Sequence, residues 1–378
     1  MLRMTPPPEA ASANTIPIRN VWHMLLYAWD MGQWIGSERV DRDTSPGLTA
    51  MLAKLLTELV TPLLHGRLQR AFDRHTAEIQ GIRGRLELAQ SIKRLSFQSG
   101  RAVCTFPQLT QDTLANRLLR ATLTWLAASD EVDQPGEAFT ELRHHLLAQT
   151  RQLDVASPIR VVPADFDRLQ LGRNDAAYQA PMTLCRFVWE RLMPLEAQGR
   201  SPLLGLLHDR KFLAEVFEAF LRNYYARRLR NCKVGRETLR WPLASEHRLV
   251  PQMKTDITIE SVAPVRRRLV IDAKFYAHAL VGQYQDSQKF SADNLYQLYA
   301  YLRTQEQVSE AHRTASGMLL YPWTSVALDE TLHIQGHEIT LATLDLTQPW
   351  AQIEGRLDAL VAKFQDEGAP AAESNVVS

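Results

Sequence analysis

The segment TDITIESVAPVRRRLVIDAKFY, residues 255–276, constrains the fold most, because it places charged side chains at the ends of two predicted strands. The apolar run LVI at residues 269–271 is typical of a strand that is covered on both faces. Asp272 and Lys274 follow this run, and since residues i and i+2 of a strand point the same way, they share one face. A buried charge in such a place needs a partner or a metal ion.

Asp256 stands at the head of the preceding predicted strand and can bring a second carboxylate to the same place. Two carboxylates and the carbonyl of Ala273 would form a site of oxygen ligands, which suits Mg²⁺ rather than zinc. Beside such an ion, Lys274 would orient or deprotonate the attacking water and stabilise charge on a phosphate. The sequence therefore predicts both aspartates and Ala273 as metal ligands, and both aspartates and Lys274 as catalytic residues.

The Asp-x-Lys triplet by itself has little specificity. An acid-x-base triplet is expected about five times by chance in this composition, and its ordinary role is an ion pair at a strand end. The context favours chemistry, because the triplet ends an apolar strand, a carboxylate begins the strand before it, and a distinctive helix follows. Asp-(x)n-Asp-x-Lys in this frame resembles the signature of the PD-(D/E)xK nuclease fold.

The helix predicted for SADNLYQLYAYLRTQ, residues 291–305, supports this interpretation. Its apolar stripe at helical spacing is Leu295, Leu298, Tyr299 and Leu302. Gln297 and Tyr301 are four residues apart and are predicted on the opposite side. Such a Gln-x-x-x-Tyr pair resembles the motif of RecB-like nucleases, in which it supports the active site. The alternative is an exposed polar pair.

A second helix, predicted at residues 210–231, carries a further candidate acid. Its core stripe is Leu213, Val216, Phe217, Phe220 and Tyr224. Glu218 flanks that stripe and is therefore a candidate supporting carboxylate, although a solvated helix glutamate is the simpler alternative.

The same helix ends in a basic segment that supplies the candidate DNA-binding residues Arg222, Arg227, Arg228, Arg230 and Lys233. Near a nuclease site, such a segment is typical of a surface that follows phosphates without reading the base sequence. Taken alone, it is a solvated helix end that complements the helix dipole. Net charge indicates no nucleic-acid partner, because 43 Lys and Arg balance 42 Asp and Glu, so any basic surface must be local.

The chain is expected to be α/β, or α+β overall, with two ordered regions. Residues 16–199 are predicted to form an N-terminal partner-binding region of mixed helix and strand, and residues 200–365 a nuclease domain. Residues 1–15 and 366–378 are predicted to be disordered, and the linker is predicted at residues 196–202. The element order expected beyond the linker is helix 210–231, strand 255–260, strand 268–276, helix 291–305 and strand 317–323.

Shorter patterns organise the N-terminal region. Helices are predicted at residues 20–34, 47–72 and 112–129, and a β-like stretch followed by a short helix at residues 75–94. Pro62 is expected to kink the second helix, and Asp112 is expected to be the N-cap of the third. The stretch RNDAAY, residues 173–178, is predicted as a surface loop.

Several functions are excluded by what the sequence lacks. No G-x-x-x-x-G-K-[ST] motif is present, so the chain is not expected to bind nucleoside triphosphates through a P-loop. Cys104, Cys185 and Cys232 lie far apart without C-x-x-C spacing, which argues against a structural zinc site and fits a reducing compartment. The start lacks the apolar region of a signal peptide and no run of 18 apolar residues occurs, so a cytoplasmic protein without a membrane partner is expected.

Seven stretches together resemble one family and fall in the same order as in that family. They are IPIRNVWHMLLYAW (16–29), GIRGRLELAQSIKR (81–94), DTLANRLLRATL (112–123), MKTDITI (253–259), LVIDAKFY (269–276), KFSADNLYQLYAYL (289–302) and LLYP (319–322). The family is McrC, the nuclease subunit of McrBC-type modification-dependent restriction systems, and the resemblance covers most of residues 16–350. Its catalytic positions fall on Asp256, Asp272 and Lys274, although Thr255 stands where the PD element has proline.

The resemblance implies partners that residue spacing does not show. McrC-like proteins work with McrB, a AAA+ GTPase that recognises methylated cytosine and forms hexameric rings, so GTP would be bound by the partner and not by this chain. The N-terminal region would project into that ring and stimulate GTP hydrolysis, with Arg83 and Arg85 as candidate ring contacts. The arginine-rich loop VRRR, residues 265–268, would contact double-stranded DNA.

The leading hypothesis is a Mg²⁺-dependent DNA endonuclease subunit of a GTP-dependent, methylcytosine-directed restriction complex. Two alternatives stay open. One is a stand-alone RecB-like DNA nuclease that cuts without a partner, and the other is a catalytically vestigial activator of a AAA+ ring.

Overall fold

The computed structural model describes residues 16–35, 47–242, 249–262, 266–275, 280–282, 288–290, 292–322 and 328–364. The ends predicted to be disordered, residues 1–15 and 366–378, lie outside these described residues, as does Val265 of the VRRR loop. The chain divides into two compact units, Glu38–Gly205 and the combination of Met1–Ser37 with Leu206–Ser378. The first helix, α1 (Ile18–Ala28), therefore belongs with the C-terminal residues, although the sequence grouped it with residues 16–199.

Helices dominate the unit Glu38–Gly205. They are α3 (Leu48–Leu64), α5 (Leu114–Ala127), α6 (Glu137–Gln152), α7 (Ala164–Asp167), η3 (Arg173–Tyr178), α8 (Gln179–Phe187), η4 (Val188–Leu192) and α9 (Met193–Glu196). Leu52 and Leu56 of α3, like Leu119 and Leu123 of α5, are fully buried, as one-turn spacing on a core-facing stripe requires. Pro62 lies inside α3, which ends at Leu64, well before the predicted end at residue 72.

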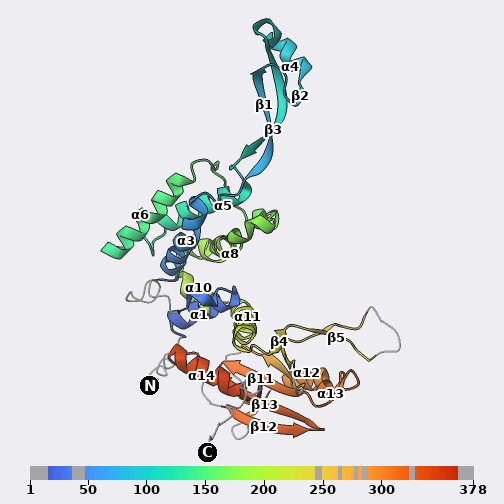
Figure 1. Ribbon diagram of the computed structural model, residues 1–378. Helices are drawn as coiled ribbons and strands as arrows, with labels where there is room; N and C mark the ends of the chain where they lie inside the picture. Colours follow the sequence, from blue (N-terminus) through green and yellow to red (C-terminus); the bar gives the residue numbers. More distant parts are fainter. Residues whose placement is uncertain are drawn as a thin grey trace, which may run out of the picture. The chain divides into compact units, whose positions relative to one another are not determined.

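A three-stranded arm leaves the helices of this unit between α3 and α5 (Figure 1). β1 (Ala71–Gln80) pairs antiparallel with β3 (Arg101–Thr110) over ten residues, and β2 (Arg85–Leu86) pairs with the other edge of β3. α4 (Leu88–Lys93) and η2 (Ser96–Ser99) lie in the connection between β2 and β3. The β-like stretch and short helix predicted at residues 75–94 are thereby confirmed.

The turn between β1 and β2 depends on a glycine. Gly84 has φ +70°, and a Cβ atom at this position would lie 2.5 Å from the carbonyl oxygen of Thr105. Only glycine tolerates both the backbone conformation and the close approach to β3. The GIRGR motif is therefore a turn packed against the arm, and Arg83 and Arg85 on either side of Gly84 are exposed.

The other unit contains a six-stranded sheet in the order β12-β13-β11-β8-β7-β4. Its strands are β4 (Cys232–Gly235), β7 (Ile257–Ser261), β8 (Arg268–Ala273), β11 (Ser316–Pro322), β12 (Asp329–Ile334) and β13 (His337–Leu344). β11 is parallel to β8 and β13, whereas the other neighbours are antiparallel, so the sheet is mixed. Two separate pairs are β5 (Thr238–Leu239) with β6 (Met253–Lys254), and β9 (Leu280–Gly282) with β10 (Gln288–Phe290).

Two helices cover opposite faces of the sheet at β8, namely α11 (Arg210–Arg228) and α12 (Ala292–Arg303). Val270 of β8 packs in one core cluster with Leu298 of α12, whereas Phe217 of α11 contacts Phe275 just beyond β8. Alternate residues of an extended chain point to opposite faces, so these contacts place the helices on opposite sides. The remaining helices are η1 (Gly32–Trp34), α10 (Pro202–His208), α13 (Glu310–Arg313), α14 (Trp350–Leu360) and η5 (Ala362–Phe364).

The predicted order of helix, strand, strand, helix and strand is confirmed as α11, β7, β8, α12 and β11. Together with the helical unit and its arm, it makes the chain a mixed α/β protein. Three further strands that the sequence pattern did not predict, β4, β12 and β13, widen the sheet on both sides. The nuclease and partner-binding roles expected for the two regions stay predictions. No helix in the described ranges is long and apolar enough to cross a membrane.

Two local predictions in the helical unit are wrong. RNDAAY, residues 173–178, forms the helical turn η3 rather than a surface loop, and Tyr178 is only 1% exposed. Asp112 is not the N-cap of α5, because Thr113 holds that position and its hydroxyl accepts a hydrogen bond from the backbone N–H of Asn116. Both residue types cap helices well, so the sequence alone could not choose between neighbours.

Candidate functional site

The pairing of β7 with β8 brings the two predicted aspartates together. Ile257 lies opposite Ile271 in this antiparallel pair, so the next cross-strand position places Asp256 opposite Asp272. Directly opposed side chains share a face and lie within contact range. Asp256 also accepts a 3.0 Å hydrogen bond through Oδ2 from the backbone N–H of Ala273, which fixes its carboxylate beside β8.

Asp272 is buried without the partners that a carboxylate normally has. It is 1% exposed, and neither carboxylate oxygen accepts a hydrogen bond from the residues that the structure describes. Lys274 Nζ lies 3.0 Å from Oδ1, close enough for an ion pair but outside hydrogen-bonding geometry. Burial raises the pKa of Asp272 to about 7; the Lys274 ammonium opposes that rise and the Asp256 carboxylate adds to it. Such a group is stabilised by a nearby cation.

A hydrogen-bonded chain holds Lys274 from the side of α12. Lys274 Nζ donates to Gln297 Oε1 at 3.2 Å, and Gln297 Nε2 donates to Tyr301 Oη at 2.6 Å. Burial raises the pKa of Tyr301, so this phenol keeps its proton at neutral pH. The Gln-x-x-x-Tyr pair therefore supports the lysine that the sequence singled out.

The predicted face of this pair is corrected by the structure. Tyr301 does not lie opposite the apolar stripe, because it is buried in the same core cluster as Leu298 and Leu302. Tyr299, which the sequence placed in the stripe, is only half-buried and bonds through its hydroxyl to Gln335. The buried face of α12 is thus rotated toward Tyr301, and this rotation brings Gln297 within reach of Lys274.

Glu218 and Arg222 approach Asp256 from α11. Burial and the charge of Asp256 raise the pKa of Glu218, whose carboxylate pairs with Arg236 at 2.6 Å. Arg222 Nη1 lies 3.5 Å from the carbonyl oxygen of Asp256, and burial together with the charge of Arg236 lowers its pKa. Arg236 lies in the basic segment that the sequence indicated, but the sequence did not single it out as a partner of Glu218.

The donor set of this site fits a hard cation. In the described ranges no group of three His, Cys, Asp or Glu residues is arranged to hold a metal ion. Asp256 and Asp272 instead offer two carboxylates, and the backbone carbonyl of Ala273 lies between Asp272 and Lys274 in the chain. All of these donors are oxygen atoms, which Mg²⁺ and Ca²⁺ prefer. The unfilled acceptor positions of Asp272 are the feature that fits such an ion.

Thr255, which stands where the PD element of the resembled nuclease signature has proline, makes a backbone hydrogen bond of its own. The backbone N–H of Thr255 donates to the carbonyl of Glu237 at 2.9 Å, a hydrogen bond that proline could not make. Its hydroxyl in turn accepts from the backbone N–H of Glu237 at 3.0 Å. Thr255 therefore fixes the chain next to Asp256 through bonds of its own.

The predicted DNA-binding residues fall into two groups. Arg227 pairs with Asp30 at 3.2 Å, and Arg228 pairs with Asp358 at 2.6 Å, so both guanidinium groups are engaged within the unit. Arg230 and Lys233 are exposed, and Arg222 is the member nearest the aspartates.

Among the described residues of the VRRR loop, Arg266 and Arg267 are exposed and only Arg268 is buried. Arg268 is 4% exposed and pairs with Glu237 and Glu260, and Arg267 Nη1 donates to the carbonyl of Lys363 at 2.6 Å. On the arm, in the other unit, the guanidinium of Arg83 lies 4.6 Å from the centre of the Phe106 ring. The Arg85 side chain is 81% exposed and lies 3.6 Å from the Glu87 carboxylate.

Comparisons with known proteins give a consistent relationship. A family model described as "McrBC 5-methylcytosine restriction system component" matches residues 18–322. The chain is 30% identical over 346 residues to the "Type IV methyl-directed restriction enzyme EcoKMcrBC" of Escherichia coli (strain K12), a match that covers 90% of this chain and 96% of that protein.

A solved structure extends the likeness to the fold. It is described as "Refined half-complex from tetradecameric assembly of Thermococcus gammatolerans McrB AAA+ hexamers with bound McrC". The TM-score is 0.54 at 17% sequence identity, with 92% of this chain and 76% of that chain covered. At this identity the similarity concerns the fold alone.

Proposed function

Because the chain belongs to the family of McrBC 5-methylcytosine restriction system components, we propose that it is the DNA endonuclease subunit of a GTP-dependent, methylcytosine-directed restriction complex. The observation that carries this proposal is the buried Asp272 carboxylate, which lacks hydrogen bonds from the described residues and lies beside Asp256 and Lys274. The sheet with α11 and α12 on opposite faces supports a PD-(D/E)xK nuclease domain.

Mg²⁺ would be held by Asp256, Asp272 and the carbonyl of Ala273, and when bound it polarises the scissile phosphate and lowers the pKa of a coordinated water. Lys274 orients the attacking water and stabilises negative charge on the phosphate. Gln297 and Tyr301 hold the ammonium of Lys274 in place through the chain of hydrogen bonds at 3.2 and 2.6 Å. Glu218 adds negative charge near Asp256 and acts as a supporting carboxylate.

DNA would be held mainly through its phosphates. Arg222, Arg230 and Lys233 are the basic candidates whose charge is best placed for this contact, because Arg227 and Arg228 already pair with aspartates. Contacts of this kind give affinity without sequence readout. Recognition of the methylated base therefore falls to the partner.

The partner is a McrB-like AAA+ GTPase in a hexameric ring, and it binds the GTP. The arm formed by β1, β2, β3, α4 and η2 is the part of the N-terminal region suited to reach into such a ring, since two ten-residue strands extend it away from the helices (Figure 1). Arg83 and Arg85 lie exposed on this arm and are candidate contacts.

Plasmid cleavage tests the proposal directly. Purified chain with Mg²⁺ is incubated with methylated or unmethylated plasmid, each with and without the AAA+ partner and GTP. Cutting that requires partner, GTP and methylation together is the expected result. Cutting by the chain alone would instead identify a stand-alone nuclease. Stimulated GTP hydrolysis with intact DNA in every condition would identify an activator and overturn the catalytic assignment.

A further inference from the structure

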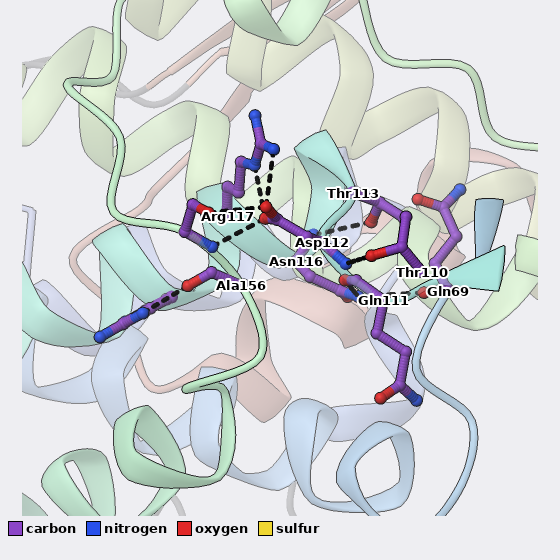
Figure 2. A network of polar contacts seen from close by, with 10 residues as sticks. Gln69, Thr110, Gln111, Asp112, Thr113, Asn116, Arg117 and Ala156 are labelled. Atoms are coloured by element: carbon purple, nitrogen blue, oxygen red, sulfur yellow. Dashed lines mark hydrogen bonds and ion pairs between the residues drawn. The ribbon is translucent and has the colours of Figure 1, made fainter. Parts of the chain in front are cut away.

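One buried amide ties together both strands where the arm meets the helices (Figure 2). Asn116, in the first turn of α5, is fully buried. Its Nδ2 donates to the carbonyl of Gln69, just before β1, at 3.1 Å and to the carbonyl of Gln111, just after β3, at 2.6 Å. A single side chain on the helical body therefore holds the base of each strand.

Tyr178 completes this junction from the helical turn η3. Its hydroxyl donates to Asn116 Oδ1 at 2.5 Å and accepts from the backbone N–H of Gln69 at 2.8 Å. Gln69 Nε2 also donates to Asp175 Oδ2 at 3.1 Å. The arm root, which we define as Gln69, Gln111, Asn116 and Tyr178, is thus a closed hydrogen-bonded set whose two central side chains are inaccessible to water.

A second set of hydrogen bonds, made by Asp112, fixes the end of β3. The Asp112 carboxylate accepts two hydrogen bonds from the Arg117 guanidinium, at 2.6 and 2.8 Å. It also accepts from the backbone N–H and the hydroxyl of Ser157, at 2.7 and 2.6 Å. Figure 2 shows Asp112 next to Asn116, so the two sets of hydrogen bonds are adjacent where β3 leads into α5.

Among the described residues, the arm has only a small core of its own. Its own core consists of the buried Ala102, Cys104 and Phe106 with a few half-buried neighbours, and most of β1 is exposed. A hairpin of ten-residue strands is about 30 Å long, so a rotation of about 10° at its base would move the far end by about 5 Å. A few hydrogen bonds at the root consequently decide where the far end lies.

We propose that the arm root is a rigid joint, in which Asn116 and Tyr178 are positioning residues that fix the arm's direction for stimulation of the AAA+ partner's GTP hydrolysis. This inference rests on the proposed function, in which the arm engages the ring. The buried amide and phenol leave no water to substitute for a lost hydrogen bond, so removal of either group loosens the joint. The surface of the arm that meets the partner is left unchanged.

The joint can be tested without the partner by the distance between two spin labels. The labels are placed at the exposed positions Gln98, near the far end of the arm, and Ala148, on α6, by Gln98→Cys and Ala148→Cys. Cys232→Ser removes the least buried native thiol, since Cys104 and Cys185 are buried. We expect a narrow distance distribution in this background and a clearly broader one after Tyr178→Phe or Asn116→Leu.

The matched control removes a hydrogen bond from the middle of the arm instead. The hydroxyls of Thr76 and Thr105 are 2.8 Å apart on exposed faces of β1 and β3, so Thr76→Val should leave the distribution narrow. Tyr178→Phe removes one oxygen atom and keeps the ring, so it tests the same joint if Asn116→Leu does not fold. Distance distributions of equal width in all variants would overturn the proposal that Asn116 and Tyr178 make the arm root rigid.

The effect of the arm root on GTP hydrolysis is tested with the complete complex, at a saturating concentration of this chain. Tyr178→Phe and Asn116→Leu should lower stimulated GTP hydrolysis by about three- to tenfold, whereas Thr76→Val should leave it unchanged. Broader distributions with full stimulation would refute the positioning role. If the unaltered chain fails to stimulate any AAA+ partner, the proposed function fails, while the label distances still decide whether the joint is rigid.

Discussion

Two aspartates, one in each compact unit, have opposite surroundings. Asp112 accepts hydrogen bonds from the guanidinium of Arg117 and from the backbone and side chain of Ser157. Asp272 is 1% exposed, and the described residues donate no hydrogen bond to its carboxylate. The hydrogen bonds from Arg117 hold the pKa of Asp112 well below its usual range, whereas burial raises the pKa of Asp272 to about 7.

The difference is the one expected between a structural carboxylate and a carboxylate that binds a ligand. Asp112 has its acceptor positions filled by the protein, so it contributes to the fold and has no capacity left for a ligand. Asp272 accepts no hydrogen bond from the described residues, and burial of its charge destabilises the folded state despite the ion pair with Lys274. The proposed function assigns to Asp272 the binding of a cation, with Asp256 and Lys274 beside it.

The largest expected effect is the loss of cleavage in Asp272→Asn. The amide keeps the size of the side chain but cannot supply the negative charge that a metal ion requires, so the initial rate of plasmid cleavage should fall about a thousandfold. Assembly with the AAA+ partner, followed by size-exclusion chromatography, should be unchanged. Asp112→Asn is the matched control, and it should retain cleavage per GTP hydrolysed. An equal loss of cleavage in Asp272→Asn and Asp112→Asn would contradict the different roles given to the two aspartates.

Stability should move in opposite directions for the same pair of substitutions. In Mg²⁺-free buffer at pH 8, Asp272→Asn should raise the local free energy of unfolding by about 1–3 kcal/mol, because it removes a charge whose burial costs more than its ion pair with Lys274 contributes. Asp112→Asn should lower it by about 1–2 kcal/mol, because the amide cannot accept all the bonds that the carboxylate accepts. Hydrogen exchange in peptides from β8 and from α5 measures the two units separately, as the chain need not unfold in one step.

The pH dependence of these differences follows from the two pKa shifts. The folded-state pKa of Asp272 is raised, so its penalty develops as pH rises from about 4 toward 7 and is complete above that range. The advantage of Asp272→Asn should therefore vanish in acid. The folded-state pKa of Asp112 is lowered, so its contribution is complete above about pH 4 and is lost as pH falls below that value. Differences that do not change with pH would contradict both assignments.

Pattern and spacing placed one of these aspartates correctly in the fold and misjudged the local role of the other. Asp272 follows an apolar strand and shares a face with Lys274, and both facts are visible locally in the sequence. That its carboxylate lacks hydrogen bonds is a matter of three-dimensional packing that no spacing reveals. Asp112 precedes a strong helical pattern, which suggested a cap, yet its partner Ser157 lies 45 residues away. Long-range contacts of this kind decide between equally good local interpretations.

The arm root shows the same limit. RNDAAY has the composition of a loop, and nothing in it indicates that Tyr178 is buried against the base of β1. A signal did exist at Asn116, which is a polar residue in line with Leu119 and Leu123 on the buried stripe of α5. The β12–β13 hairpin also had a signal in the sequence, namely Gly336, and the structure gives positive φ angles to both turn residues, Gln335 and Gly336.

Mg²⁺ should stabilise only the unit that contains Asp272. At a concentration ten times the dissociation constant, binding adds about 1.4 kcal/mol to the free energy of unfolding. Hydrogen exchange in β8 should slow by the corresponding factor of about ten, while exchange in α5 stays the same. Asp272→Asn should abolish the response and Asp112→Asn should preserve it. Equal protection of α5 and β8 would indicate a non-specific ionic effect.

The smallest effects, and the sharpest separation, come from two tyrosine hydroxyls. Tyr301→Phe removes the group that holds Gln297, and through it Lys274, so cleavage per GTP hydrolysed should fall about two- to tenfold with little change in KM for DNA. Tyr178→Phe should lower GTP hydrolysis but leave cleavage per GTP unchanged, since its hydroxyl serves the arm root. Measuring both rates in one reaction gives each variant its own control. If either substitution lowers both the rate of GTP hydrolysis and the cleavage per GTP hydrolysed, the hydroxyls act through general stability. In that case the assignment of positioning to one unit and of chemistry to the other is wrong.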